Sequence, residues 1–93
     1  MRRVLRLGRG YLRGIARLKP RGATAMSLAA TLRSLEAAEV LPGPLDGEMM
    51  IPPVRRAWFR RVAGANLWVL FEARDGEVIL LALVASPPVP LDD

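Results

Sequence analysis

Arginine is the reactive or ion-binding residue type that recurs most regularly in this chain. Arg6, Arg9, Arg13 and Arg17 recur at the spacing that places side chains on one side of a helix. Guanidinium groups in such a stripe bind phosphate or carboxylate groups. The stripe therefore predicts contact with a nucleic acid, as an RNA-binding or target-binding surface, or with an acidic protein segment. The alternative is that it forms the solvated face of an amphipathic helix.

The distribution of charge also favours an anionic partner. The 93 residues carry a net charge of +5, and every charged residue before Glu36 is basic. A basic half of this kind is typical of proteins that contact nucleic acid, acidic proteins or a membrane surface. A proteome that uses arginine in place of lysine would produce the same composition, since Lys19 is the only lysine.

Several kinds of chemistry are excluded by composition. The chain has no cysteine and no histidine, so disulfides, Cys/His metal sites and histidine acid–base catalysis are ruled out, and we expect no metal and no cofactor. The absence of cysteine favours a cytoplasmic location. The longest apolar run, from 78 to 84 and a little beyond, is far shorter than the roughly 20 residues that cross a bilayer, so no membrane is expected as a partner.

An α+β fold in a single domain, residues 1–93, is predicted from the length, the 52% apolar content and the order of patterns. The expected elements are a short strand 4–7, a helix 9–19 ended by Pro20, and a second helix from an N-cap at Thr24 to about Ala38. A Pro/Gly-rich loop, "LPGPLDGEMMIPP", follows.

The remaining elements are strands 56–62, 66–74 and 77–85, followed by a Pro-rich tail, 86–93, that cannot extend a sheet. Together they predict a short N-terminal strand, an antiparallel two-helix hairpin, and a three-stranded antiparallel meander packed on the helices.

The last two strands, "WVLFEARDGEVILLAL", meet at Asp75-Gly76, a strong signal for a two-residue hairpin turn. This turn sets a register in which Phe71 lies opposite Leu80 and Trp68 lies opposite Leu83. Both faces of the hairpin are then apolar. One face is expected to bear Leu67, Val69, Phe71, Ala73, Val78, Leu80, Ala82 and Val84, and the other Trp68, Leu70, Ile79, Leu81 and Leu83.

Two helices can cover only one of these faces. A contiguous apolar patch on a protein surface usually marks an interaction site, so the second face is predicted to be a partner interface, formed by Trp68, Leu70, Ile79, Leu81 and Leu83. The alternative is that the 42–54 loop and the tail fold over it.

The stretch "AWFRRVAGANLWVLFEARDGEVILLALVAS" resembles the RelE/ParE superfamily of bacterial type II toxins. The likeness extends to the order of elements along the whole chain and is detailed from about Arg55 to Ser86. It implies a toxin that is neutralised by a cognate antitoxin in a hetero-oligomer. RelE-like members cut mRNA on the ribosome, whereas ParE-like members poison DNA gyrase, and growth inhibition through mRNA cleavage is the first expectation.

The same resemblance implies candidate catalytic residues. Arg61 falls on a basic position of the family and Arg60 lies beside it, so these two and Arg74 are expected to stabilise charge during RNA cleavage by an endoribonuclease. Glu72 is the carboxylate nearest to them that could act as a base, and it also fits an ion pair with Arg74. Tyr11, the sole tyrosine, fits a packing role.

The chain departs from the family at other basic positions. One of them falls on Trp68, a Lys/Arg pair falls on Pro87-Pro88, and no tyrosine or histidine follows. A degenerate, noncatalytic protein-binding module and a small basic nucleic-acid-binding protein unrelated to toxins therefore remain as alternatives.

Overall fold

The computed structural model of the chain describes residues 2–51 and 55–88. Within them the elements follow in the order β1 (Val4–Leu7), α1 (Arg9–Leu18), α2 (Gly22–Ala37), β2 (Asp46–Ile51), β3 (Arg55–Arg61), β4 (Trp68–Arg74) and β5 (Glu77–Val84). The described residues form one five-stranded mixed sheet in the order β1-β5-β4-β3-β2. The α+β class is confirmed, and the sheet is larger than the predicted meander.

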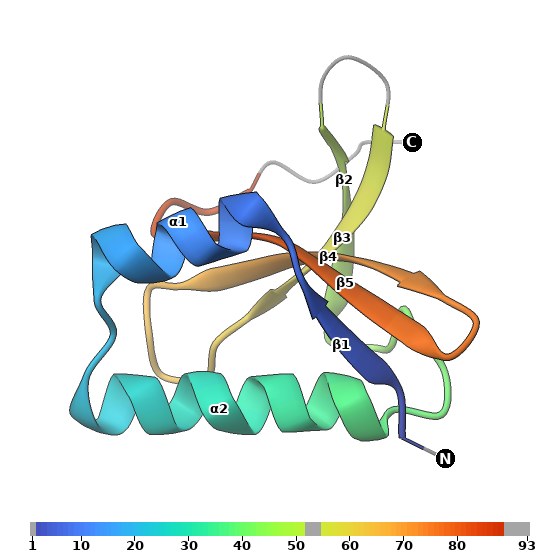
Figure 1. The fold of residues 1–93 in the computed structure, drawn as a ribbon, viewed down its shortest axis with the longest axis horizontal. Coiled ribbons are helices and arrows are strands. Elements are labelled where there is room, and N and C mark those ends of the chain that lie inside the picture. The colour runs from blue at the N-terminus through green and yellow to red at the C-terminus, as the bar shows by residue number, and fades with distance from the viewer. Residues whose placement is uncertain (1, 52–54, 89–93) are drawn as a thin grey trace.

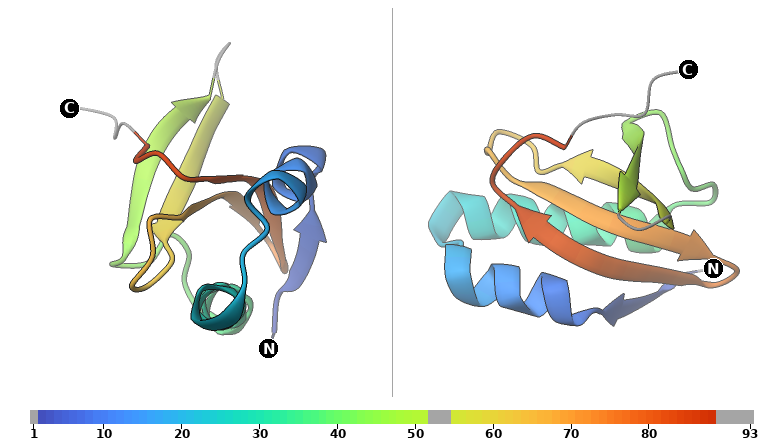
Figure 2. Two further views of the ribbon diagram at one scale, coloured as in Figure 1. Left: turned by 90° about the vertical axis from the view of Figure 1, so that its left-hand side faces the viewer. Right: turned by 90° about the horizontal axis from the view of Figure 1, so that it is seen from above.

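The first strand enters the sheet at its edge. β1 pairs in parallel with β5, from Val4 opposite Glu77 to Leu7 opposite Leu80. All other neighbouring strands are antiparallel. β1 stops at Leu7, and α1 then continues alongside the second half of β5, so that a helix takes the place of a strand at this edge (Figure 2, right).

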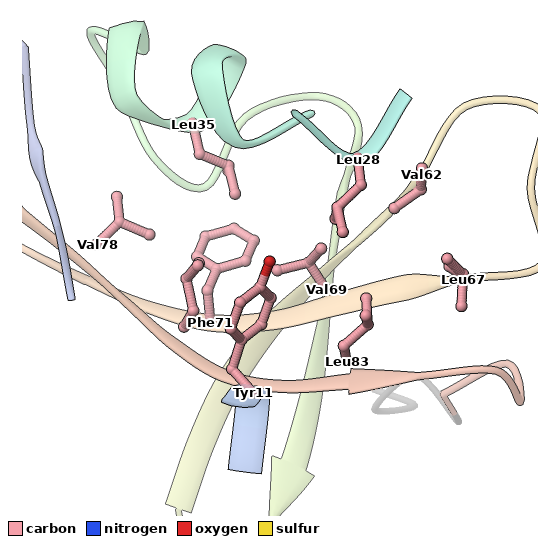
Figure 3. Close-up of a cluster of buried hydrophobic side chains, with 10 residues drawn as sticks. Tyr11, Leu28, Leu35, Val62, Leu67, Val69, Phe71, Val78 and Leu83 are labelled. Atoms are coloured by element: carbon pink, nitrogen blue, oxygen red, sulfur yellow. The ribbon is translucent and has the colours of Figure 1, made fainter. Parts of the chain in front are cut away.

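α2 covers one face of the sheet, as Figure 1 shows, and this face carries the core. We call it the core face and the opposite side the outer face. Figure 3 shows side chains from α2, β4 and β5 converging on the ring of Tyr11, which α1 supplies. The buried cluster comprises Tyr11, Leu28, Leu35, Val62, Leu67, Val69, Phe71, Val78, Leu80 and Leu83. The two helices run in opposite directions, but α1 lies chiefly against β5.

The predicted loop after α2 contains a strand that the sequence pattern does not indicate. β2 pairs with β3, from Asp46 opposite Arg60 to Ile51 opposite Arg55. Gly47, which makes this stretch look like a loop, lies under the ring of Phe59 on the neighbouring strand. A Cβ at this position would overlap the ring, so Phe59 would have to move away to admit any other residue. An aromatic side chain that covers a cross-strand glycine stabilises a pairing that strand propensity alone disfavours.

The second helix begins two residues before the predicted cap at Thr24. Gly22 starts α2 with a φ of +57°, and Arg21 holds the N-cap position without a side-chain hydrogen bond. A left-handed φ costs glycine little, so the chain turns directly from Pro20 into the helix, and Thr24 is not the cap.

A bulge changes the expected register of the last hairpin. The Asp75-Gly76 turn pairs Arg74 with Glu77 and Phe71 with Leu80, as predicted. A register shift between Leu70 and Phe71 then places Trp68 opposite Val84 and Val69 opposite Leu83. An extra residue in one strand reverses the face of every side chain beyond it. Leu83 is therefore in the core, 1% exposed, and Val84 joins Trp68 on the outer face.

Burial of Tyr11 predicts a pH-dependent stability. Desolvation raises the pKa of its hydroxyl above the ordinary value of 10.0. The folded chain therefore holds the Tyr11 proton more tightly than the unfolded chain does. Its contribution to the free energy of unfolding is fully present below about pH 10 and is lost as the pH rises through the folded pKa. We expect Tyr11→Phe to show a smaller loss of stability than the wild type between about pH 9 and 11.5, in urea denaturation curves. Parallel declines for both proteins would contradict this.

Candidate functional site

The basic stripe predicted on the first helix is present, but one of its four members is neutralised. Arg9, Arg13 and Arg17 are exposed on α1, and no ion pair joins them to an acid within residues 2–51 and 55–88. Arg6, on β1, donates from Nε to the carboxylate of Glu77 at 2.8 Å. The part of the stripe that has no ion pair among the described residues is therefore formed by Arg9, Arg13 and Arg17, which we call the α1 stripe.

A groove of about 400 Å³ lies between α1 and the end of β5. It is lined by Gly10, Arg13, Gly14, Arg17, Ala82, Leu83 and Val84. The two glycines let the backbone of α1 approach β5 closely, because a Cβ on Gly14 would lie 2.6 Å from the carbonyl oxygen of Leu83. Ala82 and Val84 lie opposite Leu70 and Trp68, so they share the outer face with them.

Cross-strand register aligns a basic and an aromatic side chain with Val84, which lines the groove. Arg61 pairs with Trp68, and Trp68 pairs with Val84, so the three form one row over β3, β4 and β5. The guanidinium carbon of Arg61 lies 5.8 Å from the centre of the Trp68 ring, within the range of a cation–π interaction. Nε of Arg61 donates to the carbonyl oxygen of Ala65 at 3.0 Å, which holds the side chain beside the indole.

Arg60, predicted to stabilise charge during catalysis, lies on the core face. It pairs with Val69 in register and is 8% exposed. Its guanidinium forms a bidentate ion pair with the carboxylate of Asp46, in which Nη2 donates to Oδ2 at 2.8 Å. Its Nη1 donates to Ser34 Oγ on α2 at 2.9 Å. The amide of Gly43 donates to the same carboxylate at 2.6 Å. Arg60 is therefore committed to a buried ion pair that joins β3 and β2 to α2.

Arg74 lies at the other end of the sheet from Arg61. β4 carries Trp68 at its start and Arg74 at its end, about 20 Å away at the rise of a strand. Glu72 lies between two arginines, because Arg55 contacts one of its oxygens and Arg74 lies 3.3 Å from the other. The ion pair of Glu72 with Arg74 is confirmed. Arg60, Arg61 and Arg74 do not converge on one point.

The predicted partner interface is only partly retained on one surface. Trp68, Ile79 and Leu81 are half-buried, and Leu70 is 7% exposed between its cross-strand neighbours Phe59 and Ala82. Leu83 belongs to the core because of the bulge in β5. Of the alternative cover, the 42–54 loop instead contributes β2, which widens the sheet. Residues 52–54 of that loop and 89–93 of the tail lie outside the described residues. Ala82 and Val84 are therefore the outer-face apolar side chains that line the groove, and Trp68 lies beside them, opposite Val84.

Sequence reasoning missed the structural roles of two groups of residues. Asp46 falls in a predicted loop, although it is the buried counter-ion of Arg60. Gly10 and Gly14 look at sequence level like residues that weaken local structure, although they line the groove. Their spacing of one helical turn in "GYLRG" is the signal that a backbone lies close to that side of the helix.

Within the described ranges, no group of three potential metal-ligating side chains comes together. No helix in that part of the chain is long and apolar enough to cross a membrane.

Comparison with protein-family models, with curated proteins and with solved structures found no match to this chain. Its function is therefore inferred from its own residues and geometry.

Proposed function

We propose that the protein is the toxin component of a type II toxin–antitoxin pair of the RelE/ParE kind, that it acts in the cytoplasm on ribosome-associated mRNA, and that an antitoxin neutralises it. The observation that carries the proposal is the arrangement of elements. The first strand lies beside the last one, and two helices and an antiparallel meander follow it in the chain. The resemblance seen in the sequence from Arg55 to Ser86 belongs to that meander.

The charge on the helix supports an anionic target. The α1 stripe offers three exposed guanidinium groups and has no carboxylate partner among the described residues. Phosphate contacts of this type supply most of the non-specific affinity of proteins for nucleic acid, independently of sequence. An mRNA on the ribosome is a target of this chemistry.

The placement of the arginines favours binding over cleavage. Cleavage through a 2′-hydroxyl requires a base, an acid and charge stabilisation at one phosphate. Arg60 is held by Asp46 on the core face, while Arg61 and Arg74 lie at opposite ends of the hairpin strands. We therefore place occupation of the target ahead of mRNA cleavage, and a noncatalytic protein-binding module is the second candidate that this observation favours.

Inducible expression of the chain in a bacterial host tests the proposal. We expect growth and amino-acid incorporation to stop after induction, and coexpression of a cognate antitoxin to restore them. A variant with Arg9, Arg13 and Arg17 changed to glutamine is expected to relieve the arrest, because these side chains provide the phosphate contacts. Changing Arg2, Arg21 and Arg33 instead removes the same charge outside the stripe and is expected to leave the arrest intact.

The outcomes separate the candidates. Normal growth and translation after induction would refute the toxin proposal and leave the binding module. Cuts at the ribosomal A site in primer extension would show that the toxin is an endoribonuclease after all. Accumulation of cleaved gyrase–DNA complexes would assign the target to DNA gyrase.

A further inference from the structure

We infer that the ligand of the groove is single-stranded RNA, which runs from Arg61 and Trp68 across the end of the sheet to Arg13 and Arg17 on α1. This inference deepens the proposed function, on which it rests, by placing the RNA on named residues. It concerns the outer face and the edge of β5, and it does not involve the buried Arg60.

The groove has the charge that a phosphate backbone requires. Of its seven lining residues two are arginines, three come from the apolar end of β5, and the other two are glycines. None of them is acidic, and neither Arg13 nor Arg17 forms an ion pair with a described residue. Cationic side chains on the rim and an uncharged floor attract a phosphate group without a competing carboxylate.

The row beside the groove has the chemistry that binds bases. An indole and a guanidinium both offer planar surfaces on which an unpaired base stacks. Trp68 and Arg61 are neighbours in register and 5.8 Å apart, and Val84 connects them to the groove. Neighbouring strands lie about 4.8 Å apart, so the row from β3 to β5 spans about 10 Å. That length fits a short segment of nucleic acid.

The basic groove and the adjacent row of Arg61, Trp68 and Val84 together favour a single strand of RNA over the other anionic ligands. A duplex keeps its bases stacked on each other, so it can use the arginines but not Trp68. An acidic protein segment would likewise be satisfied by Arg13 and Arg17 alone. Only an unpaired strand uses phosphate contacts on α1 and a stacking surface on β4 together.

Binding of a labelled uridine oligomer of about ten nucleotides to the full-length chain tests this, with DNA of equal length and an RNA duplex as comparisons. We expect Arg13→Gln combined with Arg17→Gln to weaken binding of the single strand about tenfold or more. The dependence of log affinity on log salt should also fall by about 1.4, because each phosphate that is no longer neutralised lowers the slope by about 0.7. The control, Arg21→Gln with Arg33→Gln, removes equal charge from exposed positions outside the groove, and we expect a change of about twofold or less.

A second readout follows the indole directly. In a Trp58→Phe background Trp68 is the only tryptophan, and we expect the RNA oligomer to quench its fluorescence at the same concentrations that saturate binding. Trp68→Leu should weaken binding about tenfold, as expected when one base can no longer stack. Thermal denaturation of each variant separates weaker binding from damage to the fold.

Three results would overturn the inference: equal weakening by the groove and control pairs, an unchanged indole signal on RNA binding, or equal affinity for duplex and single strand. Binding of a polyglutamate peptide, and of no RNA, with the same dependence on Arg13 and Arg17 would assign the groove to an acidic protein. Growth arrest that persists without RNA binding would sink this inference and leave the toxin proposal standing. RNA binding without growth arrest would refute the toxin proposal and leave this inference standing.

Discussion

Asp46→Asn is expected to lower the free energy of unfolding by about 3–5 kcal/mol, because it breaks a buried ion pair from one side. The side chain of Asp46 is fully buried, and it neutralises an Arg60 side chain that is only 9% exposed. Asparagine keeps the shape but removes the charge, so the guanidinium stays buried without a counter-ion. Loss of one partner of a buried pair costs far more than the intact pair contributes.

Urea denaturation of Asp46→Asn, Arg60→Met and the double variant measures this effect. The double variant should be clearly more stable than the sum of the single losses predicts, because neither charge remains unpaired in it. Arg56→Gln is the matched control. It breaks the exposed pair with Glu48 on the same two strands, at 3.9 Å, and should cost less than about 1 kcal/mol. A small loss in both Asp46→Asn and Arg60→Met would show that water reaches Arg60.

The same ion pair shows why part of the fold could be predicted from the sequence and part could not. Strand β1, helix α1 and the Asp75-Gly76 hairpin are encoded locally, by periodicity and by turn residues, and all three are predicted. β2 is stabilised by partners far along the chain: Phe59 over Gly47, and Arg60 against Asp46. Propensity within "DGEMMI" carries no sign of these contacts. Strand pairing with a distant segment overrides local preference there.

The candidate site likewise has one part that the sequence predicts and another part that depends on distant contacts. The α1 stripe follows from helical spacing, so its position is predictable. The position of Arg60 toward the helices also follows from strand alternation, but its role depends on a counter-ion in a segment predicted to be a loop. The exchange of Leu83 for Val84 on the outer face depends on one extra residue in β5. A bulge of this kind has no marker in a continuous apolar run such as "EVILLALV".

Gly10→Ala and Gly14→Ala are each expected to destabilise the protein by about 1–3 kcal/mol, although alanine is the better helix former. At Gly10 a methyl group would overlap the carbonyl oxygen of Leu81, and at Gly14 it would lie 2.6 Å from that of Leu83. The obstacle in both cases is strand backbone, which cannot rotate away as a side chain can. α1 would have to move off β5 and open the core at Tyr11.

The preference for glycine over alanine at positions 10 and 14 is diagnostic, because alanine is preferred on the exposed side of the same helix. Ala16 is exposed on α1, so Ala16→Gly should lose only the propensity difference, about 1 kcal/mol, with no change in the groove. If close packing of α1 on β5 is correct, denaturation midpoints should fall for alanine at 10 or 14 and also for glycine at 16. Stabilisation by alanine at both glycine positions would mean that α1 lies farther from β5. The volume of the groove between α1 and β5 would then exceed about 400 Å³.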